Sequence, residues 1–253
     1  MTVIVWIVRY GLTKFPLVED DGPYDSPIDP TEGVEHAKAI AARIASDVQD
    51  KPTVVYSSPF VRTTETASFI AQACSEDDNR VDVRIEDGLT EWQIPSLLVV
   101  KDTGIRTYPK STKELAEMFS NIDASYASVN PFDETVDGSP QFPETEEQLL
   151  KRCQRTIDLI IEKEKHQIAI NGEMGSDSPL SICIVSHAPC DQAIAYALEG
   201  AKSPFESTLT PWPLGGITKI VDNKIVQYGD TSHMPGIYKE GTKHWSLPCL
   251  EKK

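Results

Sequence analysis

Four polar turns along the chain carry residues that could act together on a phosphoryl group. Three of them directly follow short apolar runs and the fourth follows an alternating run: Arg9-Tyr10-Gly11, Ser58-Pro59-Phe60-Val61-Arg62, Ser186-His187-Ala188 and Glu91-Trp92. Two guanidinium groups could cradle the charged oxygens of a phosphoryl group, and a histidine could donate to the same oxygens. A carboxyl group whose pKa is raised by burial could protonate a leaving oxygen. These residue types predict a phosphoryl-transfer site in which Tyr10 is the only evident nucleophile.

Each of these residues also has a plainer interpretation. Arg9 and Arg62 could form surface salt bridges, and His187 could be a hydrogen-bonded histidine of the core. Glu86 or Asp87 could take the place of Glu91 as the acid, because the predicted end of the strand before them is accurate only to within a few residues. Thr13 could bind the ligand or only cap the turn.

Buried strands must carry these turns to one place. Three short runs are mostly apolar and rich in β-branched residues, which is typical of strands buried on both faces: Val3–Val8, Thr53–Ser57 and Leu180–Val185. The alternating run Asn79–Ile85 predicts a half-exposed strand. Amphipathic patterns predict helices between the strands, over about 31–48, 63–73, 145–165 and 189–198. The predicted fold is therefore α/β, a three-layer sandwich with a mostly parallel sheet flanked by helices, which binds ligands beyond the carboxyl ends of its strands.

Two further segments complete the predicted organisation. The sequence from about 93 to 144 is long, irregular and rich in Pro, Ser and Asp, with one predicted helix near Thr112–Phe119. A loop of this length in a compact domain is typically a lid or a functional insertion. Near the C-terminal end, the pattern over about 217–228 predicts a hairpin that turns at Asp222-Asn223. No linker separates two cores, so we expect a single domain over 1–253.

The composition excludes several classes of function. The chain has 253 residues, 40% of them hydrophobic, and a formal net charge of −15. This acidity disfavours direct binding of nucleic acid or of an anionic membrane surface, although a local arginine cluster could still bind a phosphorylated ligand. Five cysteines without CxxC spacing predict neither a disulfide framework nor a zinc site, and no metal or cofactor is expected. The first apolar run is too short for a signal peptide or a membrane span, so we expect a cytoplasmic protein.

Taken in order, these motifs resemble the histidine phosphatase superfamily, also called phosphoglycerate-mutase-like. That family has an Arg-His-Gly turn after its first strand, a Ser-Pro-x-x-Arg-Thr-x-x-Thr-Ala segment, a glutamate at a later strand end and a late Ser/Thr-His-Ala turn. The second motif is matched from Ser58 to Ala67, and the segment Asp25–Gly33 is similar to the family's approach to its first helix. The resemblance covers the chain from Val3 to about Leu198.

The resemblance implies a role for each candidate residue. It implies a phosphate-binding group made of Arg9, Arg62, His187 and Thr13. It implies a catalytic group made of residue 10, Glu91 and His187, with the glutamate as the acid.

The chain departs from the family at the phosphoryl-accepting histidine, which falls on Tyr10. A phenol has a reference pKa of about 10, so little of it is ionised at neutral pH. Its side chain is also longer than that of histidine, and a phosphotyrosine ester hydrolyses far more slowly than a phosphohistidine. We therefore expect phosphomonoesterase activity to be absent or strongly reduced, with a pocket retained for a phosphorylated small molecule or phosphoprotein.

Two other functions stay open at this point. The chain could be an active phosphomonoesterase that uses a non-standard nucleophile, or one in which Tyr10 has been substituted for a natural histidine. It could also be a purely structural interaction subunit, since fold does not fix function, although the convergence of Arg9, Arg62, Glu91 and His187 argues against that. The sequence leaves open a homodimer or membership of a larger complex.

Overall fold

The central element is a mixed six-stranded sheet with the order β3-β2-β4-β1-β5-β6. The structure is a computed structural model that describes residues 1–13, 25–99, 104, 106–171, 179–203, 206–235 and 245–251. The strands are β1 (Val3–Arg9), β2 (Val54–Ser57), β3 (Val83–Ile85), β4 (Leu180–Ser186), β5 (Ile217–Val221) and β6 (Lys224–Asp230). The first four strands pair in parallel, whereas β5 and β6 are antiparallel to their neighbours. The prediction of a mostly parallel sheet is confirmed.

Helices connect the strands much as the apolar periodicity predicts. They are α1 (Glu32–Ala45), α2 (Val61–Cys74), α3 (Pro95–Leu98), α4 (Thr112–Met118), α5 (Glu146–Asn171) and α6 (Ala188–Glu199), with short 3-10 helices η2 (Asp87–Leu89) and η5 (Pro248–Leu250). The predicted strand over 79–85 is too long, because the backbones of Glu76 and Asn79 pair with each other in a turn before β3 begins. Of the helices described, none is both long and apolar enough to cross a membrane.

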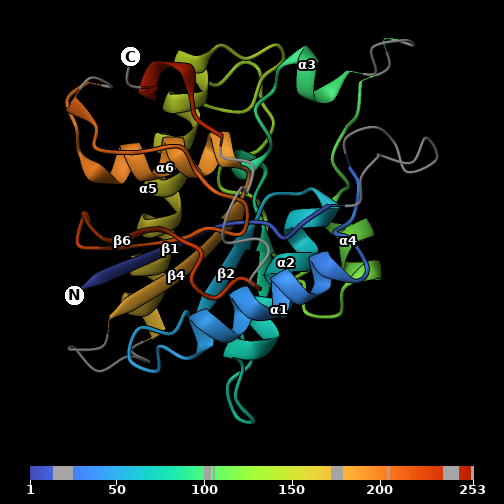
Figure 1. The fold of residues 1–253 in the computed structure, drawn as a ribbon, viewed down its shortest axis with the longest axis vertical. Coiled ribbons are helices and arrows are strands. Elements are labelled where there is room, and N and C mark those ends of the chain that lie inside the picture. Colours follow the sequence, from blue (N-terminus) through green and yellow to red (C-terminus); the bar gives the residue numbers. More distant parts are fainter. Residues whose placement is uncertain are drawn as a thin grey trace.

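Helices cover both faces of the sheet, which gives the fold three layers. Alternate residues of β1 point to opposite faces: Ile4, Trp6 and Val8 pack with α1 and α2, whereas Val5 and Ile7 pack with α5 and α6. All five side chains are buried. Figure 1 shows α1 and α2 on one side of the sheet and α5 and α6 on the other. Burial on both faces explains why the strand is a continuous apolar run rather than an alternating one.

The parallel strands end at one edge of the sheet. β4 lies between β1 and β2, with Arg9 opposite Ser186 and Ser57 opposite Val185. β3 follows on the far side of β2, where Ile85 is opposite Ser57. This register brings the four polar turns of the sequence to neighbouring positions.

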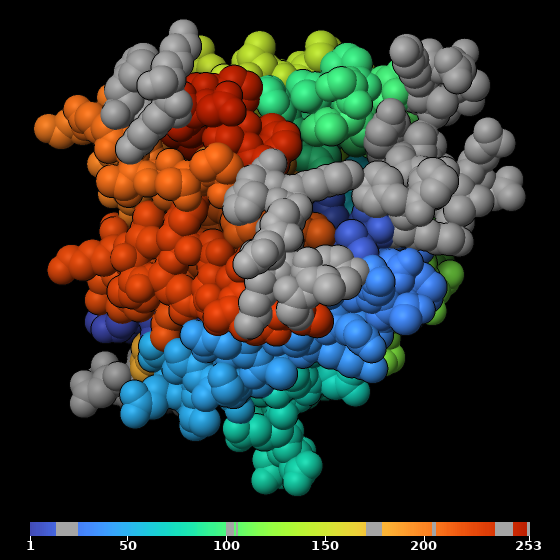
Figure 2. Space-filling model, in the orientation of Figure 1, coloured from blue at the N-terminus to red at the C-terminus, as the bar shows by residue number. Residues whose placement is uncertain are grey.

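The hairpin at the C-terminal end extends the sheet beyond β1. Asp222 and Asn223 turn the chain with φ values of 47° and 61°, a left-handed conformation that asparagine and aspartate tolerate in two-residue turns. Arg43 of α1 donates to Gln227 at 3.2 Å and lies 3.6 Å from Asp230. Figure 2 shows α1, in blue, and the hairpin, in orange-red, side by side on one face of the molecule.

Candidate functional site

The carboxyl edge of the sheet gathers five of the six predicted site residues. Arg9 ends β1 and Tyr10 follows it, Arg62 lies in the first turn of α2, Glu91 follows η2, and His187 precedes α6 directly after β4. The Tyr10 ring lies 5.5 Å from the His187 ring, and it lies 5.0 Å from the Cζ of Arg62 and 6.0 Å from the Cζ of Arg9. The convergence predicted from the strand ends is therefore present.

Thr13 is the sixth predicted residue. It is buried, lies four residues after the end of β1, and forms an isolated antiparallel bridge with Ile28. This bridge connects the turn after β1 to the chain just before α1, and a contact between Thr13 and the ligand stays a prediction.

Arg62, Glu91 and His187 form a compact polar cluster. The Arg62 Nη2 donates to Glu91 Oε2 at 3.2 Å, and the same oxygen lies 3.0 Å from the Nδ1 of His187. Arg62 Nη2 also lies 3.1 Å from His187 Nδ1. All three side chains are less than a tenth exposed. Buried charges are stable only when they are paired and hydrogen-bonded, so each member of the cluster depends on the other two.

Ser58 completes a hydrogen-bonded chain through His187. Its Oγ lies 2.8 Å from His187 Nε2, on the opposite side of the ring from Glu91. An ionised carboxylate can only accept, so the proton of a neutral His187 belongs on Nδ1, and Nε2 then accepts from the serine hydroxyl. The sequence contains Ser58 in its longest motif, but no role for its side chain follows from the motif alone.

Burial and charge set the protonation states of this cluster. Burial lowers the pKa of His187 to about 4, even though the nearby Glu91 favours the charged ring. Burial alone would raise the pKa of Glu91, but His187, Arg62 and the backbone N–H of Trp92 bring it down to about 2. At neutral pH the pair is thus a carboxylate beside a neutral imidazole. The raised pKa that an acid at Glu91 would need is not present in this state, because His187 and then Arg62 outweigh the effect of burial.

The neutral, buried His187 makes stability depend on pH. An unfolded histidine binds a proton near pH 6.5 and the folded one only near pH 4, so the unfolded state binds more protons between these values. The contribution of His187 to stability therefore falls as the pH is lowered through this window, by about 2 kcal/mol between pH 7 and pH 5. Urea unfolding of the unaltered chain and of His187→Gln at both pH values measures this. We expect a smaller difference between the two pH values in the variant, and an equal difference would contradict the assignment.

Close backbone approach holds the turn that carries Tyr10. A Cβ at Gly11 would lie 2.8 Å from the carbonyl oxygen of Gly33, so the turn requires glycine here. The N–H of Gly11 donates to Thr66 Oγ1 at 3.2 Å. Arg9 Nη1 donates to the carbonyl of Trp212 at 3.2 Å. The first strand, α1, α2 and the C-terminal part of the chain thus fix the position of residue 10 together.

Glu86, one of the two alternative acids before Glu91, has a structural role instead. It is fully buried and accepts hydrogen bonds from Gly88, Tyr126, Ser128, Val129 and Asn130. Four of these donors lie in the segment between α4 and α5. Glu86 thus ties that segment to the end of β3, while Glu91 faces the cluster.

A buried ion pair that the sequence does not announce supports the segment before Glu91. Arg152 of α5 and Glu144 are joined by two hydrogen bonds of 2.7 and 2.8 Å, and both side chains are fully buried. Arg152 Nη1 also donates to the carbonyls of Gly88 and Thr90 at 2.7 and 3.0 Å. The one signal in the sequence is an arginine on the apolar face of the helix over 145–165.

The described ranges contain no group of three or more His, Cys, Asp or Glu residues that could hold a metal ion.

Comparison with solved structures gives related folds at low sequence identity. The ecdysone phosphate phosphatase from Bombix mori, in complex with tungstate, has a TM-score of 0.60 at 13% identity, covering 96% of this chain and 98% of that one. A mycobacterial glucosyl-3-phosphoglycerate phosphatase has a TM-score of 0.53 at 17% identity, covering 86% and 89%. The phosphoserine phosphatase from Entamoeba histolytica, in complex with 3-phosphoglyceric acid, has a TM-score of 0.51 at 19% identity, covering 92% and 100%. At such identities the likeness concerns the fold.

Sequence comparison identifies the family. No curated protein matches the chain in sequence. The family model described as "Histidine phosphatase superfamily (branch 1)" matches residues 5–220, a stretch that runs from β1 into β5 and includes Arg9, Arg62, Glu91 and His187. The chain belongs to the histidine phosphatase superfamily, branch 1.

Proposed function

We propose that this chain is a histidine-phosphatase-like protein with absent or strongly reduced phosphomonoesterase activity, whose remaining pocket binds a phosphorylated small molecule or phosphoprotein. The observation that carries the proposal is the place of Tyr10. Its ring follows β1 directly and lies 5.0 Å from the Arg62 guanidinium and 5.5 Å from His187. By the family resemblance, a nucleophilic imidazole would stand there.

The chemistry of the cluster supports reduced turnover. A neutral imidazole attacks phosphorus without first losing a proton, whereas a phenol must lose one to become a good nucleophile. Glu91 is ionised in the ligand-free cluster, and it can serve as the acid once a bound anion raises its pKa. The component that the family's reaction lacks here is therefore the nucleophile.

The basic side chains that could hold an anion are present. The Cζ atoms of Arg9 and Arg62 lie 6.0 and 5.0 Å from the centre of the Tyr10 ring, and the planar guanidinium group can donate two hydrogen bonds to phosphate oxygens at once. The family's solved relatives include phosphatases for ecdysone phosphate and phosphoserine, which supports a phosphorylated ligand here.

We also propose that the protein works in the cytoplasm, without direct contact to nucleic acid or membranes. A homodimer or a larger complex is compatible with this role.

Sulfate binding tests the pocket, because sulfate stays a dianion over the accessible pH range. The Glu91 carboxylate shares Arg62 with any incoming anion and repels it. We expect Glu91→Gln to bind sulfate about tenfold more tightly than the unaltered chain, and Arg9→Met to bind it about tenfold more weakly. Calorimetric titration at neutral pH measures both.

The opposite directions of the two effects separate a specific site from general damage to the fold. A chain that binds no sulfate in any variant, or that binds it equally in all three, would refute the retained pocket. Background hydrolysis of a simple phosphomonoester by the unaltered chain completes the test. Turnover that His187→Ala abolishes would overturn the proposed loss of activity.

A second function, active phosphomonoester hydrolysis, is favoured by one observation. The Ser58 hydroxyl lies 2.8 Å from His187 Nε2, and His187 Nδ1 lies 3.0 Å from Glu91. In that reaction the Ser58 oxygen would attack phosphorus, His187 would take its proton, and the leaving alcohol would depart after protonation by the same imidazole. The full burial of Ser58 weighs against this route. Loss of turnover in Ser58→Ala, with sulfate binding intact, would support it.

A further inference from the structure

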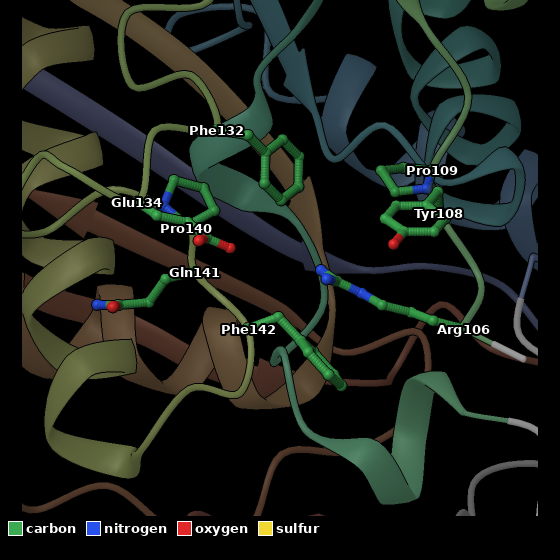
Figure 3. A pocket seen from close by; sticks show the side chains of 8 residues that line it. All are labelled: Arg106, Tyr108, Pro109, Phe132, Glu134, Pro140, Gln141 and Phe142. Carbon is green, nitrogen blue, oxygen red and sulfur yellow. The ribbon is translucent and has the colours of Figure 1, made fainter. Parts of the chain in front are cut away.

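The segment between η2 and α5 encloses a pocket that the family reaction does not explain. Its volume is about 410 Å³, within the usual range for small-molecule sites. Eight described residues line it, and five of them are aromatic or proline: Arg106, Tyr108, Pro109, Phe132, Glu134, Pro140, Gln141 and Phe142. Figure 3 shows Phe132 on one side, Tyr108 and Pro109 on the other, and the Arg106 side chain reaching between them. We refer to these eight residues as the aromatic pocket.

Two aromatic side chains of this pocket are unusually exposed. Tyr108 is 66% exposed and Phe132 is 40% exposed. Within the described part of the chain, they are the only aromatic residues among the large hydrophobic side chains that face solvent. Single exposed apolar residues are ordinary, but two rings that line the same hollow mark a place where apolar ligand surface can be buried.

Arg106 is held in the pocket wall by the rings beside it. Its Cζ lies 3.9 Å from the centre of the Phe142 ring and 4.7 Å from that of Tyr108. Its Nη2 donates to Gln93 Oε1 at 2.9 Å. The buried Nε has no hydrogen-bond partner among the described residues. A guanidinium group fixed in this way presents a flat, cationic surface on which an aromatic ring can stack.

One side chain connects the aromatic pocket to the cluster at the sheet edge. Gln93 accepts from Arg106 through its amide oxygen, and its Nε2 donates to the carbonyl of Glu91 at 2.7 Å. Gln93 is buried, and its own backbone pairs with Glu144. Hydrogen bonds through Gln93 therefore connect the wall of the aromatic pocket to the backbone of Glu91.

We propose that the aromatic pocket binds a planar aromatic ring of the phosphorylated ligand, which makes the ligand class an aromatic phosphomonoester. This inference rests on the proposed function, because the phosphate of the same ligand would lie at Arg9 and Arg62. Flat ring and proline walls fit a planar ring better than a puckered or flexible group. The polar lining is sparse, and sugar hydroxyls would need more partners than Arg106, Glu134 and Gln141 supply. A pocket of this size also suits one ring system better than an extended proline-rich peptide.

Calorimetric titration of the unaltered chain with four probes tests the inference. The probes are 1-naphthyl phosphate, cyclohexyl phosphate, inorganic phosphate and 1-naphthol. We expect 1-naphthyl phosphate to bind about tenfold more tightly than cyclohexyl phosphate, because only the former stacks on the pocket rings. Phe132→Ala and Tyr108→Ala should each weaken 1-naphthyl phosphate about tenfold and leave inorganic phosphate within about twofold of its original affinity.

Matched variants and distinct outcomes keep the test sharp. Met118→Ala truncates another exposed apolar side chain, 50% exposed and outside the pocket, and should change no affinity. Equal binding of the aromatic and the cyclohexyl ester, with no loss in Phe132→Ala or Tyr108→Ala, would overturn the inference and leave the proposed function standing. Binding of 1-naphthol that depends on Phe132, without any binding of inorganic phosphate, would support the pocket and overturn the proposed function. A proline-rich peptide that displaces 1-naphthyl phosphate and binds more tightly would overturn the inference in favour of a peptide site.

Discussion

Replacing Tyr10 by histidine is expected to turn the chain into a measurable phosphomonoesterase, with turnover raised about 10²-fold or more over the unaltered chain. The new imidazole would follow β1 at the point where Arg9, Arg62 and His187 already converge. It could attack phosphorus without prior deprotonation and form an intermediate that water cleaves readily. Steady-state hydrolysis of an aryl and an alkyl phosphate measures the gain.

The charge state of Glu91 predicts how this gain depends on the leaving group. An incoming phosphate dianion takes Arg62 away from Glu91 and adds a second negative charge, which raises the pKa of the carboxyl group above its resting value of about 2. Glu91 can then serve as the acid. We expect Tyr10→His combined with Glu91→Gln to lose the hydrolysis of alkyl phosphates far more than that of activated aryl phosphates, which need no proton.

Tyr10→Phe is the matched control for this experiment. It keeps the ring against Arg62 and removes only the hydroxyl group, so it should show no gain. An inactive Tyr10→His that still binds sulfate would contradict the prediction and would mean that the site differs from an active one in more than a single residue.

Breaking the Arg152–Glu144 pair is expected to cost about 3–5 kcal/mol of the free energy of unfolding. In Arg152→Met, the carboxylate of Glu144 would stay fully buried without its counter-ion, and the carbonyls of Gly88 and Thr90 would lose their donor. Urea unfolding at neutral pH measures the loss. The segment that leads to Glu91 would be the first to loosen, since it is held by those two carbonyls.

Arg155 provides the control on the same helix. It is exposed, and its Nε donates to Asn130 at 3.3 Å. Arg155→Met should change the free energy of unfolding by less than about 1 kcal/mol. Adding Glu144→Leu to Arg152→Met should recover part of the loss, because it removes the unpaired charge. A cost for Arg152→Met as small as that for Arg155→Met would contradict the proposed importance of the buried pair.

The sequence was most informative where the chain obeys a simple period. Val3–Val8 and Leu180–Val185 could be identified as buried strands because both faces are apolar, and the positions of Arg9 and His187 follow from where these runs stop. The alternating run Asn79–Ile85 misled because Asn79 closes a tight turn with Glu76, and β3 begins only at Val83. Alternation of apolar and polar residues shows that a segment could form a strand with one buried face. It does not show whether another strand lies beside that segment to pair with it.

The chemistry of the cluster was less predictable than its location. Arg62, Glu91 and His187 are far apart in the sequence, so only the folded chain shows that His187 and Arg62 lie 3.0 and 3.2 Å from the Glu91 carboxylate. Together they lower its pKa although burial alone would raise it. The aromatic pocket could not be predicted for a different reason. Its residues lie in irregular backbone, where no periodicity indicates which side chains face each other.

The position of β1 in the sheet has a consequence for the synthesis of the protein. β1 is made first, but its two neighbours, β4 and β5, begin at Leu180 and Ile217. At a translation rate of about 5–20 residues per second, β1 waits about 10–30 s for its first partner. During this time an apolar strand with two unpaired edges is available to other chains and to chaperones. Residue 10 therefore reaches His187 at the sheet edge only after β4 has been synthesised.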